Sequence, residues 1–387
     1  VAIYALATTP VLRGADQPPT LAPQRSSSID GLRGVLALSV VFYHGYLWQG
    51  LLRDGVWQVP ASRIFAHLGP GAVAVFFMIT GYLFWGKMLR ERGRPDWLVL
   101  YVGRLFRIGP VYLLAIALML LSVGFRTHWT LQGGLGHLLH AVAVWLPLGA
   151  QAGMPNVNGL SRTFLLTAGV TWSLRYEWFF YLALLGLAVM ARGGRARAVG
   201  MLAVALALTF AWALLHPDTG SALPPLPIAC ALFLCGMLAA SLPPLPRAAG
   251  RDGWLSLAVM ALVAASFAAP AAFSPLSVAC LGLAFYAIAS GCTVFGFLGT
   301  RPARRLGDVS YPLYLLHGLV LSTLALLPMP LAKPAFWAVL LGAAILAVLL
   351  ATAAHVLVER PGSELGRRVA RTVTASARGR VLAGRPD

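Results

Sequence analysis

Long apolar stretches alternate with short polar segments along almost the whole chain. A membrane-spanning helix needs roughly 17 to 25 mainly apolar residues, and about ten such stretches are present. They lie at residues 30–52, 69–89, 106–124, 171–191, 198–215, 226–242, 254–272, 275–298, 309–328 and 335–358. The pattern predicts an all-α polytopic membrane protein, a bundle of about ten transmembrane helices with no soluble domain. A tail of residues 1–28 would precede a membrane domain of residues 29–361, and a basic tail of residues 362–387 would follow it.

One further apolar run, 135–149, is too short to cross a membrane easily and contains His137 and His140. It is re-entrant, interfacial or an eleventh span. The surrounding segment, about 125–170, carries several Gly, Pro and Asn residues and is a candidate lid over an outward-facing mouth.

Basic residues indicate the orientation, because loops rich in Lys and Arg stay in the cytosol. With ten spans and a cytosolic N-terminus, 24 basic residues fall inside and five outside. An eleventh crossing at 135–149 would invert every later loop and move the basic C-terminal tail outside. The charges therefore predict ten spans with both termini cytosolic.

The composition excludes an ordinary soluble domain, since 59% of the residues are hydrophobic and only 11% are charged. The net charge of +18 comes from short basic clusters between apolar runs, which is the positive-inside pattern and not a nucleic-acid-binding surface. The four cysteines have no metal-type spacing, so no metal site is expected.

The most informative polar residues are Arg33 and His44, both within the first predicted span. At ~1.5 Å and ~100° per residue, their eleven-residue separation puts them on one helical face about 16 Å apart. Ionisable groups inside a bilayer are costly and usually face a bundle interior or a wet cavity. We therefore interpret this face as a functional site.

Two later spans add polar faces of their own. His317 shares a face with Ser310 and Tyr314, and Glu177 shares one with Ser173 and Tyr181. In the predicted topology His317 lies in the inner half of the membrane, His44 near the middle and Glu177 about two turns below the outer surface. The three form a possible ladder across the bilayer. Alternatively, a histidine simply hydrogen-bonds a neighbouring helix, and Glu177 neutralises Arg175.

Arg104 and Arg107 belong to the basic loop 87–107, and their three-residue spacing puts two guanidinium groups on one face at the start of a span. That arrangement suits a phosphate-bearing ligand. His355 and Glu359, four residues apart at the end of the last span, have a simpler interpretation as a terminal polar pair.

Six motifs in order resemble those of the acyltransferase-3 family of integral membrane acyltransferases, over roughly residues 29–361. They are the Arg33/His44 pair, Phe76-Phe-Met-Ile-Thr80-Gly-Tyr-Leu83, the Arg104/Arg107 pair, Trp172-Ser-Leu-Arg-Tyr-Glu177, Ser310-Tyr-Pro-Leu-Tyr-Leu-Leu-His317 and Glu359-Arg-Pro361. Two positions differ from the family pattern: Thr80 replaces a serine, and Arg175 replaces a small or neutral residue.

The resemblance implies transfer of an acyl group, most simply acetyl, from cytosolic acyl-coenzyme A to a hydroxyl of an extracytoplasmic or lipid-linked glycan, such as O-antigen or exopolysaccharide. It implies a location in the bacterial cytoplasmic membrane, in contact with lipid, with acyl-coenzyme A as a donor substrate and no bound cofactor. The expected catalytic residues are His44, Glu177 and His317. The expected substrate-binding residues are Arg33, Arg104, Arg107, Tyr314, Ser173 and Arg175.

Two other functions fit the sequence. The same family pattern allows an acyltransferase for a small natural product such as a macrolide sugar. A proton-coupled transporter or flippase would use Arg33, His44 and Glu177 without covalent chemistry, although no paired repeat of the kind common in transporters is visible.

Overall fold

The computed structural model describes residues 3, 7–8, 27–59, 61–151, 153–216, 223–246, 250–327 and 333–383. Most of the predicted N-terminal tail, 1–28, lies outside these residues. Regular structure in the described part is helical, apart from one isolated bridge between Val157 and Leu160. The helices are α2 (Ser27–Asp54), α3 (Arg63–Arg90), α4 (Trp97–Arg126), α5 (Leu135–Trp145), the 3-10 turn η3 (Thr163–Thr167), α6 (Trp172–Ala191), α7 (Arg195–Leu215), α8 (Leu226–Ser241), α9 (Arg251–Ala268), α10 (Pro275–Ala289), the 3-10 turn η4 (Phe297–Gly299), α11 (Arg301–Asp308), α12 (Ser310–Leu324), α13 (Lys333–Ala354), the π-turn η5 (His355–Glu359) and α14 (Arg360–Ala383).

The all-helical fold is confirmed, and each predicted span overlaps a helix. Among the described residues, seven helices are long and apolar enough to cross a membrane. They are α2, α3, α4, α6, α7, α9 and the continuous helix Pro334–Val373 formed by α13 and α14. Helices α8, α10 and α12 have only 15 or 16 residues, about 23 Å of helix, which is less than the ~30 Å hydrocarbon core. The number of about ten spans stays a prediction.

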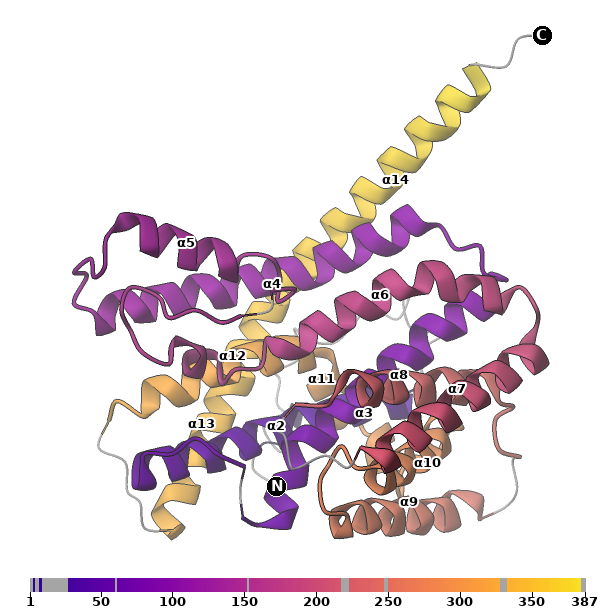
Figure 1. Cartoon of the computed structure of the whole chain (residues 1–387), viewed down its shortest axis with the longest axis horizontal. Helices are drawn as coiled ribbons and strands as arrows, with labels where there is room; N and C mark the ends of the chain where they lie inside the picture. Colours follow the sequence, from indigo (N-terminus) through magenta and orange to yellow (C-terminus); the bar gives the residue numbers. More distant parts are fainter. Residues whose placement is uncertain are drawn as a thin grey trace.

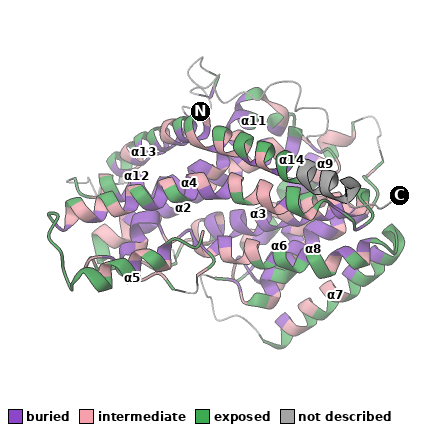
Figure 2. Cartoon of the chain, turned by 90° about the horizontal axis from the view of Figure 1, so that it is seen from above, coloured by how far each residue is buried: buried purple, intermediate pink, exposed green. Residues whose placement is uncertain are grey.

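The outer helices present apolar side chains away from the protein. Helix α7 lies at one edge of the molecule, and much of its surface is exposed (Figure 2). Leu208, Leu214 and Leu215 on this helix are more than 60% exposed. A soluble protein rarely exposes such a contiguous apolar surface, whereas lipid tails are as apolar as leucine. This surface therefore fits contact with the membrane interior.

Helix α4 begins earlier than the sequence predicted. Asp96 caps it by accepting a hydrogen bond from the Val99 N–H at 3.0 Å, which satisfies one of the free N–H groups of the first turn. The helix therefore starts at Trp97 and not near residue 106. Arg104 and Arg107 therefore lie about two turns or more inside the helix, and their place at the start of a membrane span stays a prediction.

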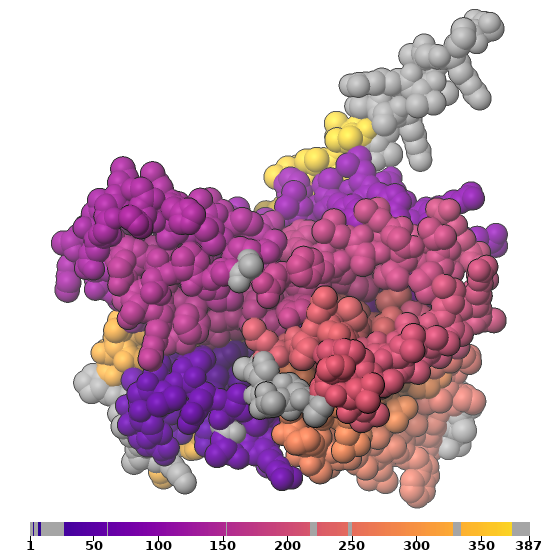
Figure 3. Space-filling view, in the orientation of Figure 1, coloured from indigo at the N-terminus to yellow at the C-terminus, as the bar shows by residue number. Residues whose placement is uncertain are grey.

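The connection from α4 to α6 has an outer part and a buried part. Helix α5 runs beside α4 (Figure 1) and its Trp145 carbonyl accepts a hydrogen bond from Tyr112 at 2.7 Å. With 11 residues it is about 16 Å long, too short to cross the membrane. Figure 3 shows α4, α5 and α6 as a continuous upper layer on this face. The following turn η3 is buried and packs on α12, where Ser322 donates to the Leu166 carbonyl. Helix α6 therefore begins inside the bundle.

The end of the chain forms one long helical unit. Helix α13 continues through the π-turn η5 into α14, which packs along α4 and then projects from the bundle (Figure 1). Much of the segment predicted as a basic tail, 362–387, is consequently helical as far as Ala383.

A close helix contact that can be tested by mutation joins α3 and α8 through two glycines. A Cβ atom at Gly236 of α8 would collide with the Met78 carbonyl, and one at Gly81 of α3 with the Phe233 carbonyl. Such small-residue contacts let transmembrane helices approach closely. We expect Gly236→Ala to destabilise the protein by about 2 kcal/mol or more, measured as a lower melting temperature in detergent. Gly186→Ala, in open space on α6, is the matched control, and equal melting temperatures for both variants would contradict this packing.

Candidate active site

A cavity of about 440 Å³ lies among α2, α3, α4, α6 and α12 and reaches the start of α7. Its polar lining residues are Asp30, Arg33, Thr80, Tyr82, Arg90, Arg104, Arg107, Ser173, Glu177, Tyr181, Arg195, Ser310, Tyr311 and Tyr314. Among these described residues, five arginines face only two carboxylates. The excess of guanidinium groups makes the cavity suitable for a ligand with several negative charges.

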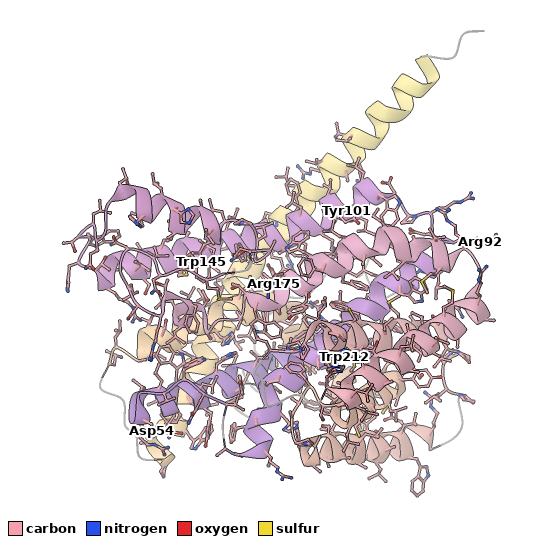
Figure 4. The ribbon with its side chains drawn as sticks, in the orientation of Figure 1. Asp54, Arg92, Tyr101, Trp145, Arg175 and Trp212 are labelled. Carbon is pink, nitrogen blue, oxygen red and sulfur yellow. The ribbon has the colours of Figure 1, made fainter. Side chains whose placement is uncertain are left out.

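The cavity opens at the end of the molecule that carries Arg90, Arg92 and Arg195, which we call the basic end. Arg90 ends α3 and Arg195 begins α7, and both are exposed while lining the cavity. Arg92 lies at one end of the long axis, and Asp54 lies at the other (Figure 4). A charged ligand can therefore enter from the basic end without crossing the bundle.

The wall formed by α4 holds the predicted arginine pair. The Arg104 guanidinium lies over the Phe84 ring, 5.0 Å from its centroid, a geometry typical of a cation–π contact. Arg107 Nε lies 3.9 Å from Glu359 Oε1. The structure thus brings Arg104, Arg107 and Arg33 to one cavity, as the sequence predicted.

Glu177 also lines this cavity, on the side that carries Arg104 and Arg107. It accepts a hydrogen bond from Tyr181 at 2.9 Å and interacts electrostatically with Arg104 and Arg107. The predicted ladder of His317, His44 and Glu177 is therefore wrong in its order. The physical reason is the buried turn η3, because it makes α6 start deep in the bundle and run from there to the basic end.

Tyr314 forms the inner end of the cavity. Its hydroxyl lies 2.9 Å from the Ser173 hydroxyl and 3.1 Å from the Val170 carbonyl. Phe76, another lining residue, packs edge-to-face against the Tyr314 ring. On the far side, the ring centroids of Tyr314 and His317 are 6.3 Å apart. Tyr314 therefore separates the arginine-lined cavity from the histidines.

His44 and His317 form a direct pair behind Tyr314. His317 Nε2 lies 3.0 Å from His44 Nδ1, and neither histidine is among the described residues that line the cavity. Both rings are buried, with His317 0% exposed and His44 9%. Two predicted catalytic residues are thus in contact. They lie at the same depth in the bundle, whereas the sequence predicted two different depths.

Hydrogen bonds assign the protons of this pair. His317 Nδ1 lies 3.0 Å from the Leu313 carbonyl, which can only accept, so Nδ1 carries the proton and Nε2 is an acceptor. That acceptor faces His44 Nδ1, which also lies 3.0 Å from the Val40 carbonyl. His44 Nδ1 must therefore carry a proton, and Nε2 of neutral His44 keeps a lone pair. A nitrogen oriented in this way by a second group can act as a base or a nucleophile.

Trp57 covers the histidine pair on the other side. It lies in the connection between α2 and α3, shortly after Asp54, which is at the end of the long axis opposite to the basic end (Figure 4). Its ring stacks on His44 with an interplanar angle of 17°, and it contacts Trp48 edge-on. The pair is thus bounded by Tyr314 toward the cavity and by half-buried Trp57 toward the opposite end.

The remaining predicted residue, Arg175, does not reach the cavity. It lies half-buried near the start of α6 (Figure 4), where its guanidinium is 5.8 Å from the Tyr176 ring centroid. Its substrate-binding role stays a prediction.

Conversely, the cavity includes Arg90, Arg195 and Tyr311, which sequence reasoning missed. The two arginines belong to loop clusters already explained by the positive-inside rule, and no sequence signal distinguishes them from their basic neighbours.

Residues 26–356 match the family model described as an acyltransferase domain, the acyltransferase-3 model. The chain is also 30% identical over 334 residues to the exopolysaccharide production protein ExoZ of Rhizobium meliloti (strain 1021). That match covers 81% of this chain and 95% of the relative. No solved structure matches.

Proposed function

Because the chain belongs to the acyltransferase-3 family and is a membrane acyltransferase, we propose that it transfers an acyl group, most simply acetyl, from acyl-coenzyme A to a glycan hydroxyl. One observation carries the proposal: a cavity lined by five arginines leads to Tyr314, and the paired His44 and His317 lie directly behind it. Membership of an acyltransferase family favours covalent transfer over the transporter alternative.

The cavity supports a phosphate-rich thioester as donor. Arg104, Arg107 and Arg33 would bind the phosphates, since planar guanidinium groups suit bidentate phosphate contacts. The thioester end would extend past Ser173 toward Tyr314. A shift of the Tyr314 ring would then bring the acyl carbon to His44.

The chemistry would centre on His44 Nε2 and has two balanced forms. As a general base, Nε2 takes the acceptor hydroxyl proton while the oxygen attacks the acyl carbon, the C–S bond breaks and the thiolate receives that proton. As a nucleophile, Nε2 bonds to the acyl carbon while the C–S bond breaks, which gives an acyl-imidazolium and the thiolate. The acceptor oxygen then attacks the acyl carbon, the bond to Nε2 breaks, and the hydroxyl proton passes to the thiolate, which restores neutral His44. In either form His317 would hold His44 in the reactive tautomer.

The similarity to ExoZ and the distribution of basic residues support a proposal for the acceptor and the side from which it enters. ExoZ is named for exopolysaccharide production, which supports a glycan acceptor here. A cytosolic basic end in the bacterial cytoplasmic membrane accords with the positive-inside rule and would keep both termini cytosolic. The acceptor would then approach His44 from the opposite end, past Trp57. Glu177 would act within the donor cavity, beside Arg104 and Arg107.

A labelled-acyl experiment tests the proposal. Membranes containing the protein are incubated with radiolabelled acetyl-coenzyme A and separated into lipid-linked glycan, polysaccharide and small-molecule fractions, with His44→Ala membranes as the control. We expect wild-type-dependent label in one of the glycan fractions. Label confined to small molecules would support the natural-product acyltransferase instead. No label in any fraction, with the protein inserted and folded, would contradict acetyl transfer.

A further inference from the structure

The π-turn η5 joins α13 to α14 and contains two buried ionisable residues. His355 is 3% exposed and Glu359 is 5% exposed. A π-turn inside a long helix frequently marks a functional site, and burying a carboxylate is costly unless it is paired and hydrogen-bonded. The sequence interpreted this pair as polar residues at a helix end and placed Glu359 in the last family motif. Neither observation explains why both side chains are buried.

Three contacts connect this turn to the cavity wall. Arg360 Nε donates to His355 Nε2 at 3.1 Å, so the His355 proton is on Nδ1. Nδ1 then donates to Glu359 Oε2 at 2.7 Å. The second carboxylate oxygen, Oε1, faces Arg107 Nε at 3.9 Å. Arg360 and His355 thus orient a carboxylate whose free side faces a cavity arginine.

Helix α14 also packs tightly on both sides of Arg107. Gly362 lies against Pro110, and Gly366 lies against Phe106, with space too small for an added Cβ at either glycine. These contacts fix the start of α14 on the stretch of α4 that carries Arg107. The turn and the arginine therefore cannot move independently over more than a small distance.

The contact with Glu359 uses Nε of Arg107, which leaves both terminal Nη groups available to a ligand. The Arg107 side chain is 32% exposed and lines the cavity. A free arginine side chain loses considerable rotamer entropy when it is ordered by a ligand. Pairing with a buried, oriented carboxylate removes part of that cost before the ligand arrives.

We propose that Glu359, oriented by His355 and Arg360, is a positioning residue that holds Arg107 for a phosphate group of the donor. The inference rests on the proposed function, because it assigns the bound phosphate to the thioester donor. Glu359 touches neither the acyl carbon nor the histidine pair, so its effect should appear in donor affinity and not in the chemical step.

The test compares two donors, acetyl-coenzyme A and the acetyl thioester of N-acetylcysteamine, which has no phosphate. For Glu359→Gln we expect KM for acetyl-coenzyme A to rise roughly tenfold with kcat within about twofold. Both constants for the phosphate-free donor should stay at the wild-type values. Arg107→Gln should give the same pattern, and the double variant should add little to either single variant.

Controls separate positioning from general stability. Glu364→Gln removes an exposed carboxylate from the same helix, where it pairs with Arg367, and should change neither donor's constants. If Glu359→Gln fails to fold, Glu359→Asp keeps the charge, moves it away from Arg107, and should raise only the acetyl-coenzyme A KM.

Three outcomes would overturn this inference alone. One is an equal effect of Glu359→Gln on both donors, which indicates a structural role, and another is no effect on either donor. Additive effects of Glu359→Gln and Arg107→Gln would show that the two residues act separately. A wild-type protein inactive with both donors would overturn the proposed function itself, and this inference with it.

Discussion

His44→Ala is expected to lower acyl transfer by about 10³-fold, within the range typical for loss of a positioned acid–base group. The alanine removes Nε2, which the hydrogen-bond network leaves as the lone-pair nitrogen of the pair. Donor binding should change little, because His44 does not line the cavity. The measurements are transfer rate and coenzyme A affinity on purified protein.

His67 provides a matched control for this variant. Like His44 it is a buried helical histidine, 3% exposed, whose Nδ1 lies close to the carbonyl four residues earlier. It is on α3 and makes no contact with the histidine pair. His67→Ala should keep most of the wild-type transfer rate. If the two variants lose activity equally, the loss reflects helix packing, and the assignment of His44 to the chemistry fails.

Replacing both Arg104 and Arg107 by glutamine is expected to raise the donor KM by about 100-fold or more. A hydrogen bond to a charged group contributes about 1.5–3 kcal/mol, and each 1.4 kcal/mol is a factor of ten. The acyl-transfer step itself should be affected less than donor binding, since both arginines lie on the cavity side of Tyr314.

Arg92→Gln is the control for the arginine pair, because Arg92 is exposed at the same end and does not line the cavity. It removes one positive charge and should leave KM within about twofold. A similar rise in KM for Arg92→Gln would mean that general attraction by the basic end, and not contact in the cavity, determines donor affinity.

The sequence predicted much of this site because ionisable residues are costly inside a membrane and therefore stand out within apolar stretches. Arg33 and His44 in an apolar helix had to face the protein interior, and they do. The Arg104/Arg107 spacing likewise predicted a shared face, which does not depend on where the helix begins. Helical periodicity is a local property, so these inferences needed no knowledge of the neighbouring helices.

Depth within the bundle could not be predicted in the same way. Counting residues from the predicted surface assumed that every span starts at the membrane face, and the buried turn η3 shifts α6 inward. That shift places Glu177 in the arginine-lined cavity. The direct contact of His44 with His317 depends on how α2 and α12 cross, and the Arg107–Glu359 pair depends on how α14 packs on α4. Neither arrangement leaves a local sequence pattern.

A cryo-EM map of the purified protein with a non-hydrolysable acetyl-coenzyme A analogue tests the central claim most directly. The account predicts phosphates against Arg104 and Arg107, with the acyl end beside Tyr314 and directed toward His44. An analogue bound on another face while the arginine-lined cavity stays empty, or one whose acyl end points away from the histidine pair, would contradict it.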